Sequence, residues 1–160
     1  MHVNAIPFEV RETETASSAT DLFRRAFRSA PPSDRRHFVA LHSRDLAVAG
    51  YVHYTEFEPG VYLCGGLCVD SRLYRRLSEA ERAAMAEHGS LARWLSDNSI
   101  AALGAKRAVF AYTGDVRSRR DAFALGFVPT SGRFLLVQWH DEPEQSRDSL
   151  VRRVEHIGRF

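Results

Sequence analysis

The sequence lacks long apolar runs, and this limits the kinds of protein it can encode. None of its apolar stretches approaches the roughly 20 residues that a membrane-spanning helix needs. The first ten residues, MHVNAIPFEV, also lack a basic region followed by an apolar stretch, so no secretory signal peptide is predicted. We therefore expect a cytoplasmic protein without a membrane partner.

Lysine is almost absent, and the net charge is small. Lys106 is the only lysine, and the formal net charge is +2 over 160 residues. Arginine pairs such as Arg24-Arg25 and Arg119-Arg120 are scattered along the chain. They are not interleaved with aromatic residues, as a groove for single-stranded nucleic acid requires. The sequence therefore predicts no nucleic-acid partner, and a GC-rich coding bias is sufficient to explain the arginines.

Cysteine is scarce as well. The two cysteines, Cys64 and Cys68, lie in the stretch VYLCGGLCVD. In a strand they share a face about 13 Å apart, which is too far for a disulfide. They also lack the histidines or second cysteine pair of a zinc site, so no metal is predicted. We expect two buried free thiols; a nucleophilic role for Cys68 is the alternative.

The residues that are abundant indicate an ordinary globular domain. Hydrophobic residues make up 44% and charged residues 26% of the chain, and 160 residues suffice for one core. We predict a single domain over residues 1–142, followed by a helical tail over 143–160. The tail spaces Leu150, Val151, Val154 and Ile157 for an amphipathic helix. This helix either docks on the domain or forms a surface for a partner, such as the second subunit of a homodimer.

The first half of the chain predicts a strand, a helix and three more strands. IPFEVRE alternates as a half-buried strand does, and ASSATDLFRRAF has Ser and Thr residues suited to capping the helix that follows. HFVALHS, LAVAGYVHYTEF and VYLCGGLCVD come next, joined by short turns at residues 44–45 and at Pro59-Gly60. Three strands with such short connections predict an antiparallel meander.

The second half predicts helices alternating with strands. Ser78 stands three residues before Glu81, which is the spacing of a capping box, and predicts a helix over 78–88. A second helix over 90–103 ends at Gly104. AVFAY has the pattern of a buried strand, and SRRDAFAL that of a short helix ending at Gly126. FVPT and RFLLVQW predict the last strand, turned near Ser131-Gly132.

The order β-α-β-β-β-α-α-β-α-β is best packed as an α/β protein of the α+β type, with one mixed sheet and helices on its faces. The step from VYLCGGLCV through helix 90–103 to AVFAY predicts a parallel crossover. The C-terminal helix follows.

The run LGAKRAVFAYTGDVRSRRDAFALGFVPT resembles the second half of a GNAT-type acyl-CoA N-acyltransferase. The likeness rests on Leu103-Gly104-Ala105, on the strand RAVFAY, on Gly126-Phe127, and on the meander that ends in Val69-Asp70. It covers roughly residues 5 to 140. It implies a GNAT-like fold, and transfer of an acyl group from acetyl-CoA to a small amine by direct attack.

The resemblance also implies where coenzyme A would bind. Two neighbouring parallel strands, near 61–69 and 107–113, would part to admit the pantetheine arm, lined by Leu67, Cys68 and Val69. The diphosphate would lie at His88, Gly89 and Ser90, where the helix over 90–103 begins and N–H groups are unpaired. The family's other loop positions carry Ala84 and Glu87 here, so the signature is degenerate. The alternative is a purely structural role, in which Gly89 ends one helix and Ser90 caps the next, and this role requires no ligand.

The catalytic groups are less clearly marked. In many members of the family a tyrosine four residues before the Gly-Phe glycine protonates the thiolate, and that position is Ala122 here. Glu56 is our first choice for the base, ahead of Glu58, Asp70 and His53; we interpret His53 and His42 as satisfied residues of the sheet.

The glycines at 65 and 66 predict a bulge, where the family frees an amide to polarise the thioester carbonyl. A GNAT-like module that binds without catalysing is the alternative function.

Overall fold

The computed structural model describes residues 5–160. Its elements, in chain order, are the strand β1 (Phe8–Thr13), a 3-10 turn (Ser17–Ala19), α1 (Thr20–Phe27), β2 (Arg36–His42), β3 (Val48–Glu58), β4 (Val61–Val69), α2 (Ser71–Arg75), α3 (Glu79–Ala86), α4 (Leu91–Ala102), β5 (Ala108–Tyr112), α5 (Val116–Ala124), β6 (Val128–Pro129), β7 (Leu135–Trp139) and α6 (Glu144–Ile157). No helix in this range is both long and apolar enough to cross a bilayer.

The strands form one mixed sheet in the order β1-β2-β3-β4-β5-β7-β6. The consecutive strands β2, β3 and β4 are neighbours in it, as the predicted meander requires. β4 pairs in parallel with β5, whereas β1 with β2 and β5 with β7 are antiparallel. The predicted mixed α/β fold with a parallel crossover is therefore confirmed.

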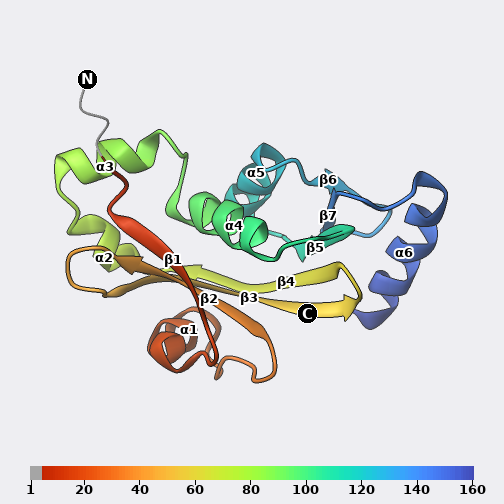
Figure 1. Ribbon diagram of the computed structural model, residues 1–160, viewed down its shortest axis with the longest axis horizontal. Coiled ribbons are helices and arrows are strands. Elements are labelled where there is room, and N and C mark those ends of the chain that lie inside the picture. The colour runs from red at the N-terminus through yellow and green to blue at the C-terminus, as the bar shows by residue number, and fades with distance from the viewer. Residues whose placement is uncertain (1–4) are drawn as a thin grey trace. The chain divides into compact units, whose positions relative to one another are not determined.

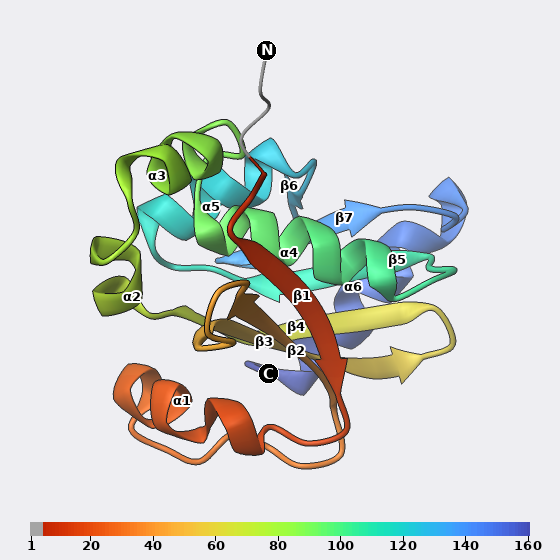
Figure 2. The same cartoon turned by 60° about the vertical axis from the view of Figure 1, so that its left-hand side comes forward.

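Contacts divide the chain into two compact units, and the first comprises the residues up to His53 together with Gly66–Ala102. In this unit α1 and α4 lie on opposite sides of the strands (Figures 1 and 2). On the α1 side, Leu22 and Phe23 of the helix pack against Val39, Tyr51 and Cys68 of the strands. The apolar spacing of α1 thus buries Leu22 and Phe23 against the sheet, whereas Phe27 at the end of the helix is 44% exposed.

The second unit comprises Tyr54–Gly65 and Leu103–Phe160. Its core joins the paired ends of β4 and β5 with β7 and α6, and its buried residues are Val61, Leu63, Ala108, Phe110, Leu135, Val137, Leu150, Val151 and Val154. The C-terminal helix is therefore docked on the sheet by the residues that the sequence pattern selected. Ile157, by contrast, is 45% exposed.

Several local predictions are confirmed by backbone detail. Ser78 and Glu81 form the capping box of α3, and Gly104, with φ of +83°, follows the end of α4. The capping of α1 was predicted wrongly. Its N-cap is Ala19, without a side-chain hydrogen bond, because Ser17 is used in the preceding 3-10 turn and the Ala19 side chain is fully buried.

Two elements differ from the sequence prediction. The short helix α2 was not predicted; it begins after Asp70, whose side chain accepts the N–H of Arg72. The last strand, predicted with a turn near Ser131-Gly132, is a pair of strands: β6 and β7 run antiparallel on either side of that turn. Both misses concern elements of five residues or fewer, which are too short for periodicity to reveal.

Candidate functional site

The turn between α3 and α4 is made by Gly89 and Ser90. Gly89 has φ of +87°, a conformation that glycine adopts without strain, and it donates its N–H to the Ala86 carbonyl at 3.1 Å. Ser90 caps α4, since its Oγ accepts the Arg93 N–H at 3.0 Å. The predicted helix stop and helix start are both confirmed.

The same turn has the chemistry of an anion site. The first N–H groups of a helix have no partner within it and carry partial positive charge. A Cβ built on Gly89 would lie 3.1 Å from Cδ and Nη1 of Arg93, so that guanidinium lies against the turn, and His88 is exposed beside it. Backbone donors with a guanidinium fit a phosphate group. The sequence analysis missed Arg93, although its place three residues after the cap was a usable signal.

β4 pairs with β5 along only part of its length. The parallel register runs from Val61↔Ala108 to Cys64↔Ala111, whereas β4 continues to Val69. Two residues beyond the paired stretch, Gly66 has φ of +63°, which is the backbone conformation of a β-bulge. The strand therefore changes its course where the glycine pair predicted a break.

The three β4 residues expected to line the pantetheine arm differ in exposure. Cys68 is buried against Phe23 and Tyr51, Leu67 is half-buried, and Val69 is 38% exposed. Burial raises the pKa of the Cys68 thiol to about 12, so the nucleophilic thiolate is scarce at neutral pH. Both cysteines are free thiols, but only Cys68 is buried, whereas Cys64 is half-buried; the prediction of two buried thiols was therefore wrong for Cys64.

His53 lies against the glycine bulge. A Cβ built on Gly66 would come within 2.6 Å of His53 Cε1 and of Phe23 Cε2, so these two rings close over the backbone at this point. His53 is 7% exposed, and its Nδ1 is buried without a hydrogen-bond partner. Burial lowers the pKa of His53 to about 4, and His37 and Arg35 lower it further by their charge. The imidazole is therefore neutral at neutral pH.

The interpretation of His42 and His53 as satisfied sheet residues was right for only one of them. His42 lies 3.1 Å from Asp45 Oδ1 through its Nδ1 and 3.3 Å from Glu81 Oε1 through its Nε2. His53 Nδ1, in contrast, has no partner. Sequence pattern could not separate the two, because both histidines alternate with apolar residues in a buried strand.

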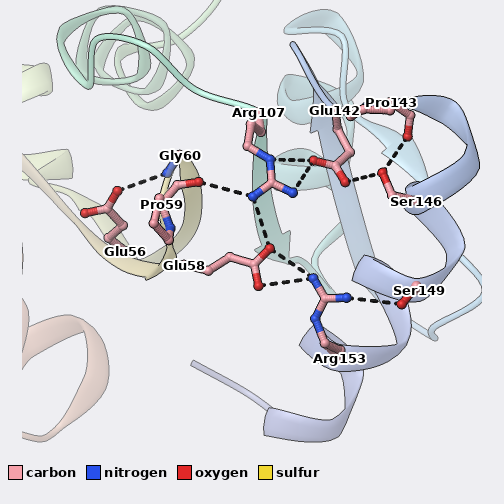
Figure 3. A network of polar contacts seen from close by, with 10 residues as sticks. All are labelled: Glu56, Glu58, Pro59, Gly60, Arg107, Glu142, Pro143, Ser146, Ser149 and Arg153. Carbon is pink, nitrogen blue, oxygen red and sulfur yellow. Dashed lines mark hydrogen bonds and ion pairs between the residues drawn. The ribbon is translucent and has the colours of Figure 1, made fainter.

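Glu56 lies in the second unit, near the tip of the β3–β4 hairpin. Its side chain is exposed, and its Oε1 accepts the Gly60 N–H at 3.0 Å (Figure 3). Glu58, by contrast, forms two ion pairs, because nitrogen atoms of Arg107 and Arg153 lie 3.2 and 2.9 Å from its Oε1. In the part of the chain that the structure describes, Glu56 forms no ion pair. Of these two carboxylates, Glu56 is therefore the one that is not held by an arginine.

The position of the family's catalytic tyrosine is Ala122, within α5. The nearest tyrosine along the preceding strand, Tyr112, packs its ring on Phe160 with centroids 5.0 Å apart. The next residue, Thr113, has a buried Oγ1 without a hydrogen-bond partner, which the sequence did not indicate. No group of three or more His, Cys, Asp or Glu that could hold a metal occurs among residues 5–160.

Solved structures of acetyltransferases have a fold similar to that of this chain. No protein-family model matches the sequence, and no curated protein matches it. Among solved structures, an acetyltransferase from Streptococcus agalactiae 2603 is 12% identical, with a TM-score of 0.54, and the match covers 84% of this chain and 99% of that one.

Two other structures of the same kind are similar. Ribosomal-protein-S5-alanine acetyltransferase from Vibrio fischeri is 14% identical with a TM-score of 0.54, over 84% of this chain and 94% of that one. FdhC, described as a nucleotide-linked sugar GNAT, is 9% identical with a TM-score of 0.56, over 92% of this chain and 95% of that one. The strand order, the partial pairing of β4 with β5 and these likenesses together identify the fold of this chain as the GNAT acetyltransferase fold.

Proposed function

We propose that this protein is an N-acyltransferase that transfers an acetyl group from acetyl-CoA to a small amine. The observation that carries the proposal is the parallel register of β4 and β5, which ends at Cys64↔Ala111, directly before the Gly66 backbone changes to φ of +63°. In a GNAT fold this is the stretch of backbone available to a thioester-carrying arm. The coenzyme supplies an activated acyl carbon with a thiolate leaving group.

The first unit would hold the coenzyme. His88, Gly89 and Ser90, together with Arg93 and the first N–H groups of α4, form the proposed diphosphate site. The Gly89 N–H is already donated to Ala86, so the helix N–H groups and Arg93 supply the binding energy. Leu67, Cys68 and Val69 would line the pantetheine arm by their backbone, since the Cys68 side chain is buried on the α1 side.

The chemical step needs a proton acceptor. As the amine nitrogen bonds to the acyl carbon, it becomes cationic and must lose a proton, and we assign this role to Glu56, directly or through water. With Ala122 at the position of the tyrosine, the chain supplies no acid there for the thiolate. We expect this to lower the rate by about the 10²–10⁴-fold that general acid catalysis contributes.

The alternative function is a GNAT-like module that binds acyl-CoA and does not turn it over. Ala122 is the observation in its favour. Titration calorimetry with acetyl-CoA, followed by a thiol-release assay with a panel of small amines, separates the two proposals. Binding with thiol release supports the enzyme, and binding without release supports the module. No detectable heat at millimolar acetyl-CoA would contradict both.

Arg93→Ala tests the proposed diphosphate site. We expect the variant to bind coenzyme A about tenfold to hundredfold more weakly, because a charge-assisted hydrogen bond contributes about 1.5–3 kcal/mol. The matched control is Arg75→Ala, which removes an exposed arginine of α2. Equal dissociation constants for the two variants in titration calorimetry would exclude Arg93 from the site.

A further inference from the structure

We propose that His53 is a catalytic residue that donates a hydrogen bond from Nδ1 to the carbonyl oxygen of the acyl thioester. The inference rests on the proposed function and deepens it. His53 would act beside the backbone amide at the Gly66 bulge, so that two donors share the charge that builds on this oxygen.

The placement of His53 is the first observation. A Cβ added on Gly66 would lie 2.6 Å from the His53 ring and 2.6 Å from the Phe23 ring. Gly66 has a positive φ inside a strand, and a mid-strand glycine of this kind marks a close approach of another group. His53 is therefore fixed at the point on β4 where the acyl group would lie.

The unpartnered nitrogen is the second observation. His53 is 7% exposed and its Nδ1 forms no hydrogen bond, although a buried polar atom without a partner costs about 1–3 kcal/mol. The neighbouring His37 does have a partner, since its Nδ1 lies 2.8 Å from the Tyr51 hydroxyl. An unsatisfied buried group in a native protein calls for an explanation, and a catalytic role is one of those known. A carbonyl oxygen of a bound thioester would satisfy Nδ1.

The charges around His53 stabilise negative charge on the carbonyl oxygen of a bound thioester. Arg35 acts on His53 by its positive charge, whereas burial and Arg35 lower the pKa of His37, so that His37 is neutral at pH 7. The acidic groups of Tyr51 and Cys68, which line the same side of the sheet, are kept protonated, because burial raises their pKa values. His53 itself stays neutral at pH 7, because burial lowers its pKa to about 4. A neutral imidazole has one N–H and can donate one hydrogen bond. The groups around His53 therefore stabilise an oxyanion rather than an ammonium group.

Phe23 of α1 packs beside His53, with ring centroids 6.2 Å apart. The Phe23 ring also contacts Phe27, with centroids 4.7 Å apart, and Phe27 is 44% exposed. The thioester carbonyl would therefore approach His53 beside an aromatic ring that packs against the exposed end of α1.

The proposed step is balanced in bonds and protons. The amine nitrogen bonds to the acyl carbon, and the carbonyl π pair moves onto the oxygen, which accepts the hydrogen bond from Nδ1–H. The oxygen then restores the carbonyl as the C–S bond breaks, and the thiolate leaves with that electron pair. The amine proton passes to water. Nδ1 keeps its own proton throughout, so His53 starts and ends neutral.

Nitrogen-15 NMR of the histidine-labelled protein tests the contact without any mutation. Spectra are recorded for the protein alone, with coenzyme A and with acetyl-CoA. We expect the His53 Nδ1 resonance to be of the protonated, donor type with acetyl-CoA and to shift relative to the coenzyme A complex, which has no carbonyl. An identical resonance in both complexes, or an unprotonated Nδ1 with acetyl-CoA, would overturn the inference.

Kinetics of His53→Phe provides the second test. We expect kcat to fall about 10²–10³-fold, as on loss of one oxyanion donor, with little change in the KM for acetyl-CoA. His53→Gln keeps an N–H donor and should recover part of the loss. The control His140→Gln changes an exposed histidine and should leave kcat unchanged.

Different results would contradict the proposed acetyltransferase function and the proposed role of His53. If the unmodified protein neither binds nor turns over acetyl-CoA, the proposed function fails and the role of His53 fails with it. If the protein binds and turns over acetyl-CoA while His53→Phe retains full kcat, the inference alone fails. If the variant does not fold, the NMR comparison on the unmodified protein still decides.

Discussion

At the scale of single residues, Gly66 is a position where the fold tolerates little change. A methyl group there meets two rings at 2.6 Å, and the backbone has φ of +63°. We expect Gly66→Ala to destabilise the protein by about 1–3 kcal/mol, which is typical of overpacking. Urea denaturation measures this. Gly114→Ala is the control, because nothing lies within 4 Å of its added Cβ, and it should change the free energy of unfolding by less than about 0.5 kcal/mol.

The buried imidazole of His53 predicts a pH dependence of stability. Its pKa is lowered from 6.5 to about 4 by burial, with His37 and Arg35 contributing. Between these values the unfolded chain binds a proton at this site that the folded chain does not, so stability falls as pH falls from about 6.5 to about 4. We expect His53→Gln to flatten this slope in urea titrations at several pH values. An unchanged slope would show that His53 is protonated in the folded state.

At the scale of elements, the start of α3 is fixed by reciprocal bonds. Ser78 Oγ accepts the Glu81 N–H at 3.2 Å, and Glu81 Oε2 accepts the Ser78 N–H at 2.7 Å. We expect Ser78→Ala to lower the free energy of unfolding by about 1 kcal/mol. Ser71→Ala, at the exposed first residue of α2, is the matched control. Equal midpoints in thermal unfolding would contradict the capping role.

Elements with local signals were predictable from the sequence, and those that depend on tertiary packing were not. The capping box of α3 and the end of α4 at Gly104 are decided by residues three or four apart. The N-cap of α1 fell on Ala19 because that residue is fully buried, which no local pattern reveals.

The residues of the candidate site also divide into those with a local sequence signal and those that depend on tertiary packing. Gly89 and Ser90 could be found from their order in the chain. The contact of Arg93 with Gly89 and the absence of a partner for His53 Nδ1 are properties of packing in three dimensions.

At the scale of the whole molecule, the two units share two strands. Of the three boundaries between them, one falls at His53/Tyr54 within β3 and one at Gly65/Gly66 within β4, and the third follows α4 at Ala102/Leu103. Independent domains are usually joined by exposed segments that few contacts cross. We therefore expect the two cores to unfold together, in a single cooperative transition.

Leu150→Ala tests this expectation from the end of the chain. Leu150 is fully buried in the core of the second unit, so its truncation should cost about 2–5 kcal/mol. Hydrogen exchange should then accelerate in β1 and β2 of the first unit as well as in β5 and β7. Ile157→Ala on the same helix, at a side chain 45% exposed, should have little effect. Faster exchange confined to the second unit would show two separate cores.

The hairpin tip at Pro59-Gly60 has a practical consequence for protein engineering. The Gly60 carbonyl accepts the Arg107 N–H at 2.7 Å, its N–H is bound by Glu56, and the Pro59 carbonyl accepts from the Arg107 side chain (Figure 3). Exposed tips between strands are ordinarily the places where an epitope tag, a fluorescent reporter or new chain termini can be introduced. This one anchors its neighbours instead, so a tag at residue 59 or 60 would damage the fold, and the exposed loop at Gly114 is the better place to put one.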